Sequence, residues 1–235
     1  MKIVEHYPVI VVGATVRGCA AASVMPESLI LESGVHLGGN WGLCYDRGRN
    51  WKNTLPESPM AEEFASNLFS RKAVLDDKVF NPALPIILAD MALRHKWNVK
   101  LNLGFLEISQ NRVVTRDVSG VTEFRAQRVI DARPSYRTEK RLTAVFHGTP
   151  GIPRLSGDDY AISPGYWPDQ YDLSMRIPVS ASWSEAREKV YHLMADLRER
   201  GIPLKLAVIG TCFAEMCFVN AVEEFNYGVS LGVQR

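Results

Sequence analysis

Neither a strong charge imbalance nor a long apolar run is present in this chain of 235 residues. The formal net charge at pH 7 is +1, so there is no bulk electrostatic attraction to nucleic acid or to an anionic membrane. No apolar run reaches the length of a transmembrane helix, and residues 1–7 are too short and too polar for a signal peptide. We therefore expect a cytoplasmic protein that binds neither nucleic acid nor membrane.

Cysteine and histidine are also scarce. The four cysteines are Cys19, Cys44, Cys212 and Cys217, and they form neither a disulfide framework nor a paired metal-ligand spacing. None of the five histidines accompanies an acid or a nucleophile in a recognisable motif. We therefore expect no metal site, and the catalytic residues stay unknown at this level.

The clearest organisation lies near the N-terminus. An apolar run at residues 9–12 ends at Gly13, residues 16–25 are rich in alanine, and a second apolar run at 29–31 ends at Glu32. Strand, glycine turn, helix, strand and terminal acid form the pattern of a dinucleotide-binding βαβ unit. The helix N-terminus offers N–H groups and positive charge to a pyrophosphate, and the terminal carboxylate can accept hydrogen bonds from ribose hydroxyls.

One position departs from the G-x-G-x-x-G pattern of such units. The turn reads GATVRG at residues 13–18, so Thr15 replaces the glycine that lets the backbone approach phosphate closely. Either the threonine hydroxyl serves as a phosphate donor, or the site is weakened. Arg17 is equally compatible with pairing to a phosphate and with a solvated surface position.

A second glycine segment, GGNWG at residues 38–42, follows the acid. Here the chain resembles the FAD-dependent oxidoreductases with the glutathione-reductase-like, two-dinucleotide-binding fold. In that family the first βαβ unit binds the ADP half of FAD, and a GG segment beyond the acid completes the cradle. Nicotinamide-binding Rossmann domains usually lack this segment, so the resemblance implies FAD as the cofactor.

Later elements follow the order of the same family. They are helices at about 59–70 and 82–97, a strand at 98–103, a β-meander at 105–125, a strand at 128–132, a helix at 185–200, a strand at 204–209 and a helix at 214–225. Two departures stand out. Arg133-Pro134 follows Ala132 where the family has A-T-G, and Thr211 follows Gly210 where it has an acid.

We predict a three-layer α/β fold of the FAD/NAD(P)-binding Rossmann-like type, as one domain over residues 1–235. Helices are expected on one face of a central parallel sheet and the meander on the other. The sheet is expected to contain strands near 8–12, 28–32, 98–103, 128–132 and 204–209. The aromatic stretch at about 134–183 is expected to form a small inserted cap, whose aromatic residues either line a substrate pocket or form a hydrophobic cluster.

The resemblance implies a cofactor-binding cradle. Its expected residues are Gly13, Ala14, Thr15, Val16, Arg17, Gly18, Glu32, Ser33, Gly38, Gly39, Asn40, Trp41, Leu106, Asp131, Ala132, Gly210 and Thr211. Asp131 also suits a role within the fold, where it satisfies backbone N–H groups. Cys44 lies where disulfide-reductase flavoproteins carry a redox pair. A dithiol would need a distant partner such as Cys212, and a small buried hydrophobe is the simpler interpretation.

The expected function is that of an FAD-binding flavoprotein, an oxidoreductase whose flavin transfers hydride to or from a small organic substrate. One alternative is a degenerate, non-catalytic protein that keeps the fold as a binding or interaction module, and another is an NAD-binding Rossmann protein. A catalytic flavoprotein needs a concave pocket near residues 40–54 and 160–176, whereas a degenerate one fills that volume with side chains such as Trp41 or Arg133.

The supply of electrons follows from what the chain lacks. There is no second nucleotide fingerprint for NADPH, so reducing equivalents are expected from the substrate or from a redox partner protein. The substrate, the direction of reaction and the oligomeric state are not readable from the residues, and a homo-oligomer stays open.

Overall fold

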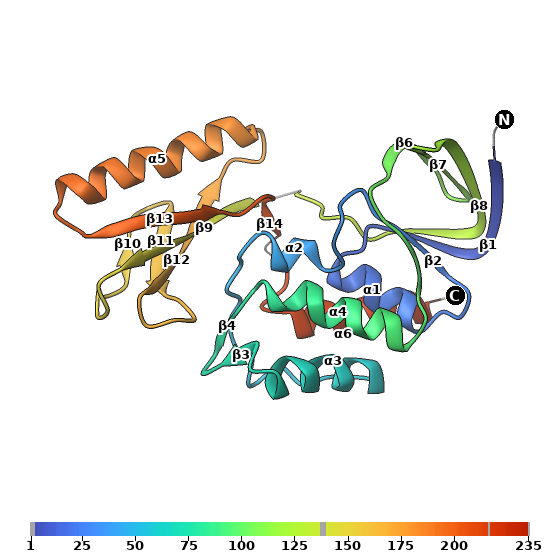
Figure 1. The fold of residues 1–235 in the computed structure, drawn as a ribbon, viewed down its shortest axis with the longest axis horizontal. Coiled ribbons are helices and arrows are strands. Elements are labelled where there is room, and N and C mark those ends of the chain that lie inside the picture. Colours follow the sequence, from blue (N-terminus) through green and yellow to red (C-terminus); the bar gives the residue numbers. More distant parts are fainter. Residues whose placement is uncertain (1–2, 137–139, 216, 235) are drawn as a thin grey trace.

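The computed structural model describes residues 3–136, 140–215 and 217–234 (Figure 1). Within these residues the chain forms two six-stranded sheets and one short hairpin, β3 (Val74–Leu75) with β4 (Lys78–Val79). The two large sheets lie at opposite ends of the molecule, and α2 (Gly39–Gly42) lies between them (Figure 1). The predicted fold class, an α/β Rossmann-like fold with a parallel sheet and a meander, is confirmed.

The first sheet contains the N-terminal strand at its centre. Its order is β5-β2-β1-β8-β7-β6. The parallel strands are β1 (Ile3–Val12), β2 (Leu29–Leu31), β5 (Asn98–Lys100) and β8 (Gly120–Asp131). The antiparallel strands β6 (Gly104–Ile108) and β7 (Arg112–Asp117) complete the meander with β8. Four of the five strands predicted for the parallel sheet are therefore in it.

The two faces of this sheet are covered differently. Successive side chains of a strand point to opposite faces. Val11 and Ile30 accordingly belong to the core shared with the helices, whereas Ile10 and Leu31 pack with Phe124 of the meander. Both faces are buried, which explains the uninterrupted apolar runs of β1 and β2.

The helices on the first face begin and end close to the predicted positions, with two exceptions. They are α1 (Val16–Ser23), α3 (Pro59–Ser70), α4 (Ala83–Arg94) and α6 (Ala221–Val233). The helix expected from residue 214 starts only at Ala221, because Ala214–Glu215 pairs with the second sheet as β14 and Asn220 caps the helix. The helix expected to reach about residue 97 also ends earlier, at Arg94.

Helices α1 and α6 contact each other through their backbones. A Cβ atom on Gly228 would lie 2.3 Å from the carbonyl oxygen of Arg17 and 2.7 Å from the Cβ of Ala20. A Cβ on Gly232 would lie 2.7 Å from the carbonyl oxygen of Ala21. These glycines allow the helix axes to approach closely, and they bring the first turn of α6 to the N-terminus of α1.

The second sheet is antiparallel. It contains β9 (Lys140–Gly148), β10 (Leu155–Ser156), β11 (Tyr160–Pro164), β12 (Gln170–Ile177), β13 (Leu204–Ile209) and β14. Helix α5 (Trp183–Glu199) covers one face, with Val190 and Leu197 packed among Phe146 and Leu173. Ser182 and Glu185 form a capping box at its start.

The prediction that residues 204–209 join the central parallel sheet was wrong. Strand β13 pairs antiparallel with β9, from Leu204 opposite Gly148 to Ile209 opposite Ala144. Lys205 and Ala207 are exposed between less exposed neighbours, which is the alternation of a strand covered on one face only. The antiparallel sheet thus extends well beyond the cap expected at about 134–183.

The aromatic residues of that stretch belong to hydrophobic clusters. Tyr171 is buried in the core beneath α5, and Tyr160 and Trp183 pack against it. Tyr166 and Trp167 contact Phe80 instead. Of the two roles left open for these aromatics, the structure shows the hydrophobic cluster. In the described residues no helix is long and apolar enough to span a bilayer.

We expect Gly228→Ala to lower the free energy of unfolding by about 1–3 kcal/mol, because the added methyl group meets backbone that no rotamer change can move. Urea unfolding followed by circular dichroism measures this. The matched control is Gly104→Ala, whose Cβ would make an ordinary 3.4 Å contact with Arg116. Equal losses in both variants would contradict the close helix contact.

Candidate functional site

The turn between β1 and α1 has the backbone geometry that the glycine pattern predicts. Gly13 has φ +96°, a conformation that favours glycine, and its N–H donates to Leu31 O at 2.8 Å. A Cβ on Gly18 would lie 2.0 Å from Gly13 O and 3.2 Å from the Cβ of Ala132. The first glycine therefore permits the turn, and the last permits close packing of the helix against β8.

The predicted acid and the second glycine segment lie directly against this turn. The Glu32 carboxylate accepts hydrogen bonds from Ala14 N at 2.6 Å, Gly34 N at 2.6 Å and the Ser33 hydroxyl at 3.1 Å. Gly38 N donates to Ala14 O at 2.6 Å. The three pieces of the predicted cradle are thus brought together in space.

Thr15 is the N-cap of α1. Its hydroxyl accepts a hydrogen bond from Gly18 N at 3.1 Å and donates to Ala132 O at 2.8 Å. The residue is 5% exposed. The hydroxyl proton is therefore directed at the protein's own backbone, and in this conformation it is not aimed at a ligand.

Arg17 is buried, and the surface position left open for it was wrong. Its side chain donates to Ala132 O at 3.0 Å, to Arg133 O at 2.7 Å and to Glu215 at 2.6 Å. The guanidinium carbon also lies 5.7 Å from the ring centre of Phe218. These three hydrogen bonds connect α1 to the C-terminal end of β8 and to β14.

A carboxylate that the sequence pattern did not single out lies at the N-terminus of α1. Glu224, in the first turn of α6, is 1% exposed. It accepts hydrogen bonds from the indole N–H of Trp41, the amide of Asn40 at 2.9 and 3.0 Å, and Arg17 N at 3.4 Å. Its Oε1 is also 3.7 Å from the Arg17 guanidinium. Burial raises the pKa of Glu224, and the charge of Arg17 and the bonds from Trp41 and Asn40 oppose that rise.

The first three N–H groups of α1 all have acceptors within the protein. Val16 N donates to the Asn40 side chain at 3.1 Å, Arg17 N to Glu224, and Gly18 N to Thr15. A pyrophosphate bound at a helix N-terminus uses these same groups and the positive end of the dipole. The side chains in their present positions therefore do not fit a pyrophosphate, although the backbone of the turn does.

Gly210 and Thr211, two of the expected cradle residues, contact the segment that follows α2. Thr211 N donates to Leu43 O at 2.9 Å, and a Cβ on Gly210 would lie 2.6 Å from Cys44 O. The end of β13 is thereby packed on the C-terminal end of α2. In this state no ring-sized space separates the two segments.

The remaining predicted cradle residues occupy separate places. Asp131, at the end of β8, accepts bonds from Arg133 N at 3.1 Å and from its guanidinium at 2.9 and 2.6 Å, which lower the pKa of Asp131 against the effect of burial. The Arg133 side chain covers Gly13, since a Cβ there would lie 2.9 Å from Arg133 Cγ. Leu106 is exposed on β6.

Two cysteines far apart in sequence meet beside this contact. Burial and the neighbouring Cys212 thiol raise the pKa of Cys44, and the Cys44 thiol lowers the pKa of Cys212. Cys212 is therefore the neighbour that a dithiol at Cys44 would require. Among the described residues no group of His, Cys, Asp and Glu could hold a metal ion.

A cavity of about 530 Å³ lies between the second sheet, the loop that follows α2 and the segment that leads into α6. It is lined by residues 46–49, by β9, β11 and β12 of the second sheet, and by the segment before α6. Its charged residues are Asp46, Arg47, Arg49, Arg141, Arg154, Asp172 and Glu223. Burial raises the pKa of Asp46 and of Asp172, and the charge of the neighbouring Arg47 opposes part of that rise at both. The concave pocket expected near residues 40–54 and 160–176 is present in this volume.

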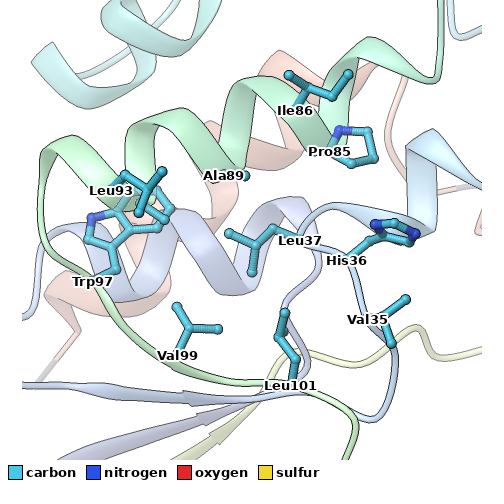
Figure 2. Close-up of a pocket in the computed structure, with 11 residues that line it drawn as sticks. Val35, His36, Leu37, Pro85, Ile86, Ala89, Leu93, Trp97, Val99 and Leu101 are labelled. Carbon is cyan, nitrogen blue, oxygen red and sulfur yellow. The ribbon is translucent and has the colours of Figure 1, made fainter.

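A second cavity of about 490 Å³ has a different character. Figure 2 shows Leu93 and Trp97 of the α4 region facing Val99 and Leu101, with Val35 in the loop after β2. Its lining is apolar apart from His36, so it offers no charged group to a phosphate.

Comparison with known proteins identifies the fold. No protein-family model and no curated protein matches the sequence. A flavoprotein/dehydrogenase from Cytophaga hutchinsonii is 16% identical, with a TM-score of 0.55 over 97% of this chain and 77% of the other. The myxobacterial chondrochloren halogenase, described as a variant of FAD-dependent halogenases, is 14% identical, with a TM-score of 0.59 over 95% and 72%. Glycine oxidase from Geobacillus kaustophilus is 12% identical, with a TM-score of 0.54 over 97% and 93%.

At these identities the likeness establishes the fold. The chain has the Rossmann-like α/β architecture that these flavoproteins share, including both the dinucleotide-type sheet and the second sheet, since the match spans nearly the whole chain.

We expect Arg17→Met to lower the free energy of unfolding by about 3–5 kcal/mol, because it leaves the buried carboxylate of Glu224 without its counter-charge. The control is Arg94→Met, which removes a half-exposed arginine paired with Glu63 and Asp90 and should cost about 0–1 kcal/mol. Urea unfolding compares the two. Similar losses would show that the Arg17 contacts are no stronger than surface pairs.

Iodoacetamide at pH 8 should alkylate Cys212 before Cys217 in the folded protein, although Cys217 is the more exposed. The thiolate is the nucleophile, and partial burial together with the charge of the neighbouring Glu215 raises the pKa of Cys217 to about 11, so roughly one in a thousand of its thiols is ionised at pH 8. Its rate should climb about tenfold per pH unit up to that pKa. Peptide mass spectrometry over time measures both rates, and faster labelling of Cys217 at pH 8 would contradict the thiol pairing.

Proposed function

We propose that this chain is an FAD-binding flavoprotein, an oxidoreductase that acts on a small organic substrate. The observation that carries the proposal is the meeting of the Gly13 turn, Glu32 and the 38–42 segment in one place, within a fold shared with FAD-dependent proteins. Membership of the glutathione-reductase-like group is part of the proposal, supported by that GG segment. FAD would supply hydride transfer, and the turn and Glu32 would hold its ADP half.

The second sheet supports a role in substrate binding. Its polar face, with Arg141 and Asp172, forms one wall of the cavity beside the cradle, and Arg47, Arg49 and Arg154 contribute further positive charge. Guanidinium groups bind carboxylate and phosphate groups with paired hydrogen bonds. We infer that the substrate is a small organic molecule carrying an anionic group, and that the chain works as one domain with this sheet as its substrate side.

A second candidate is favoured by two specific contacts. The Glu224 carboxylate lies in front of α1, and Thr211 is bonded directly to Leu43. Both fill space that a cofactor would use. These contacts support a non-catalytic protein that keeps the fold as a binding or interaction module.

The visible absorption spectrum of the purified protein, recorded before and after addition of FAD and gel filtration, decides between the candidates. Flavin bands that remain with the protein are the result expected of a flavoprotein, even at low stoichiometry. In a parallel sample, retention of added NADH, followed by its near-ultraviolet absorption, without retention of FAD would favour the nicotinamide-binding alternative. A protein that retains neither would support the non-catalytic module.

A further inference from the structure

We propose that residue 224 decides whether the N-terminus of α1 accepts a pyrophosphate group, with the Glu224 carboxylate as an internal anion in its place. The inference rests on the proposed function for the nature of the ligand. The backbone of the 13–18 turn suits a dinucleotide, whereas the side chains around the turn do not.

The donors around Glu224 are those that an anion at this position would use. Arg17 N belongs to the first turn of α1, and Trp41 and Asn40 belong to the GG segment expected to complete the cradle. Together they give the carboxylate N–H donors from two elements, beside the positive end of the helix dipole. Glu224 thus makes the bonds of a bound anion without a ligand.

The charge balance makes the two anions mutually exclusive. Arg17 is the guanidinium nearest to this position, and it already faces two carboxylates, Glu215 at 2.6 Å and Glu224 at 3.7 Å. A pyrophosphate beside Glu224 would add further negative charge where screening by water is weak. The pyrophosphate can bind only when the carboxylate leaves or is removed.

The position of Glu224 is held by its helix. Asn220, the N-cap of α6, donates to Arg49 O at 2.9 Å and to the Thr54 hydroxyl at 2.6 Å, and Gly228 fixes the next turns against α1. The helix cannot withdraw without breaking these contacts. Shortening the side chain at position 224 is therefore the change that empties the space and leaves the helix in place.

The test measures binding of inorganic pyrophosphate and of FAD by titration calorimetry on the full chain, for the wild type, E224A and E224Q. We expect E224A to bind pyrophosphate at least tenfold more tightly than the wild type, because the space and the charge are both freed. E224Q keeps the shape and loses the charge, so it should show a smaller gain in the same direction. The pyrophosphate affinity of E224Q also tests the proposal if E224A does not fold.

The matched control is E123Q, which removes another nearly fully buried carboxylate, paired with Arg125 on β8 and distant from α1 in the sheet. It should leave pyrophosphate binding at the wild-type level. Melting curves for all four proteins verify that each is folded.

The outcomes separate the two proposals. Equal pyrophosphate affinity in the wild type and in folded E224A would overturn the role of Glu224, whatever FAD does. If E224A does not fold, equal affinity in the wild type and in E224Q would overturn it. A gain for pyrophosphate without any binding of FAD would uphold the role of Glu224 and remove the flavoprotein proposal. A gain for both would support the two together.

Discussion

The backbone contact between α1 and α6 determines what surrounds the glycine turn. Because Gly228 carries no side chain, α6 lies against Arg17 and Ala20, and its first turn is carried to the start of α1. A carboxylate on that turn is then buried, and a buried charge is tolerated only when it is paired and hydrogen-bonded. Arg17, Trp41 and Asn40 meet that requirement for Glu224.

The glycine positions of the site and the side chains around them have different physical causes. Gly13 and Gly18 are required by the backbone, since Gly13 has φ +96° and a Cβ on Gly18 would lie 2.0 Å from Gly13 O. The pattern of glycines therefore reports the turn and the packing of helix on strand. Phosphate binding depends in addition on which side chains face the N–H groups, and here Glu224 and Asn40 face them.

The second sheet takes part both in a close backbone contact with the segment after α2 and in a polar cavity. Thr211 and Gly210 are packed on Leu43 and Cys44, which joins the second sheet to α2 and brings the Cys212 thiol to Cys44. Beside this contact the arginine-lined cavity offers positive charge to a ligand. The charged groups that the proposed function assigns to substrate binding therefore line a cavity separate from the nucleotide cradle.

Local patterns in the sequence determined the first βαβ unit and the meander, because apolar runs and turn residues act over a few positions. They also identified the turn at 13–18 and its acid. The partner of β13, the start of α6 and the carboxylate at the α1 N-terminus came only from the tertiary structure. The sequence of an apolar strand does not specify which strand it pairs with. Likewise, an acid in the first turn of a helix does not specify which element that end of the helix contacts. Both depend on contacts between residues far apart in the chain, such as Glu224 with Trp41, which no local periodicity encodes.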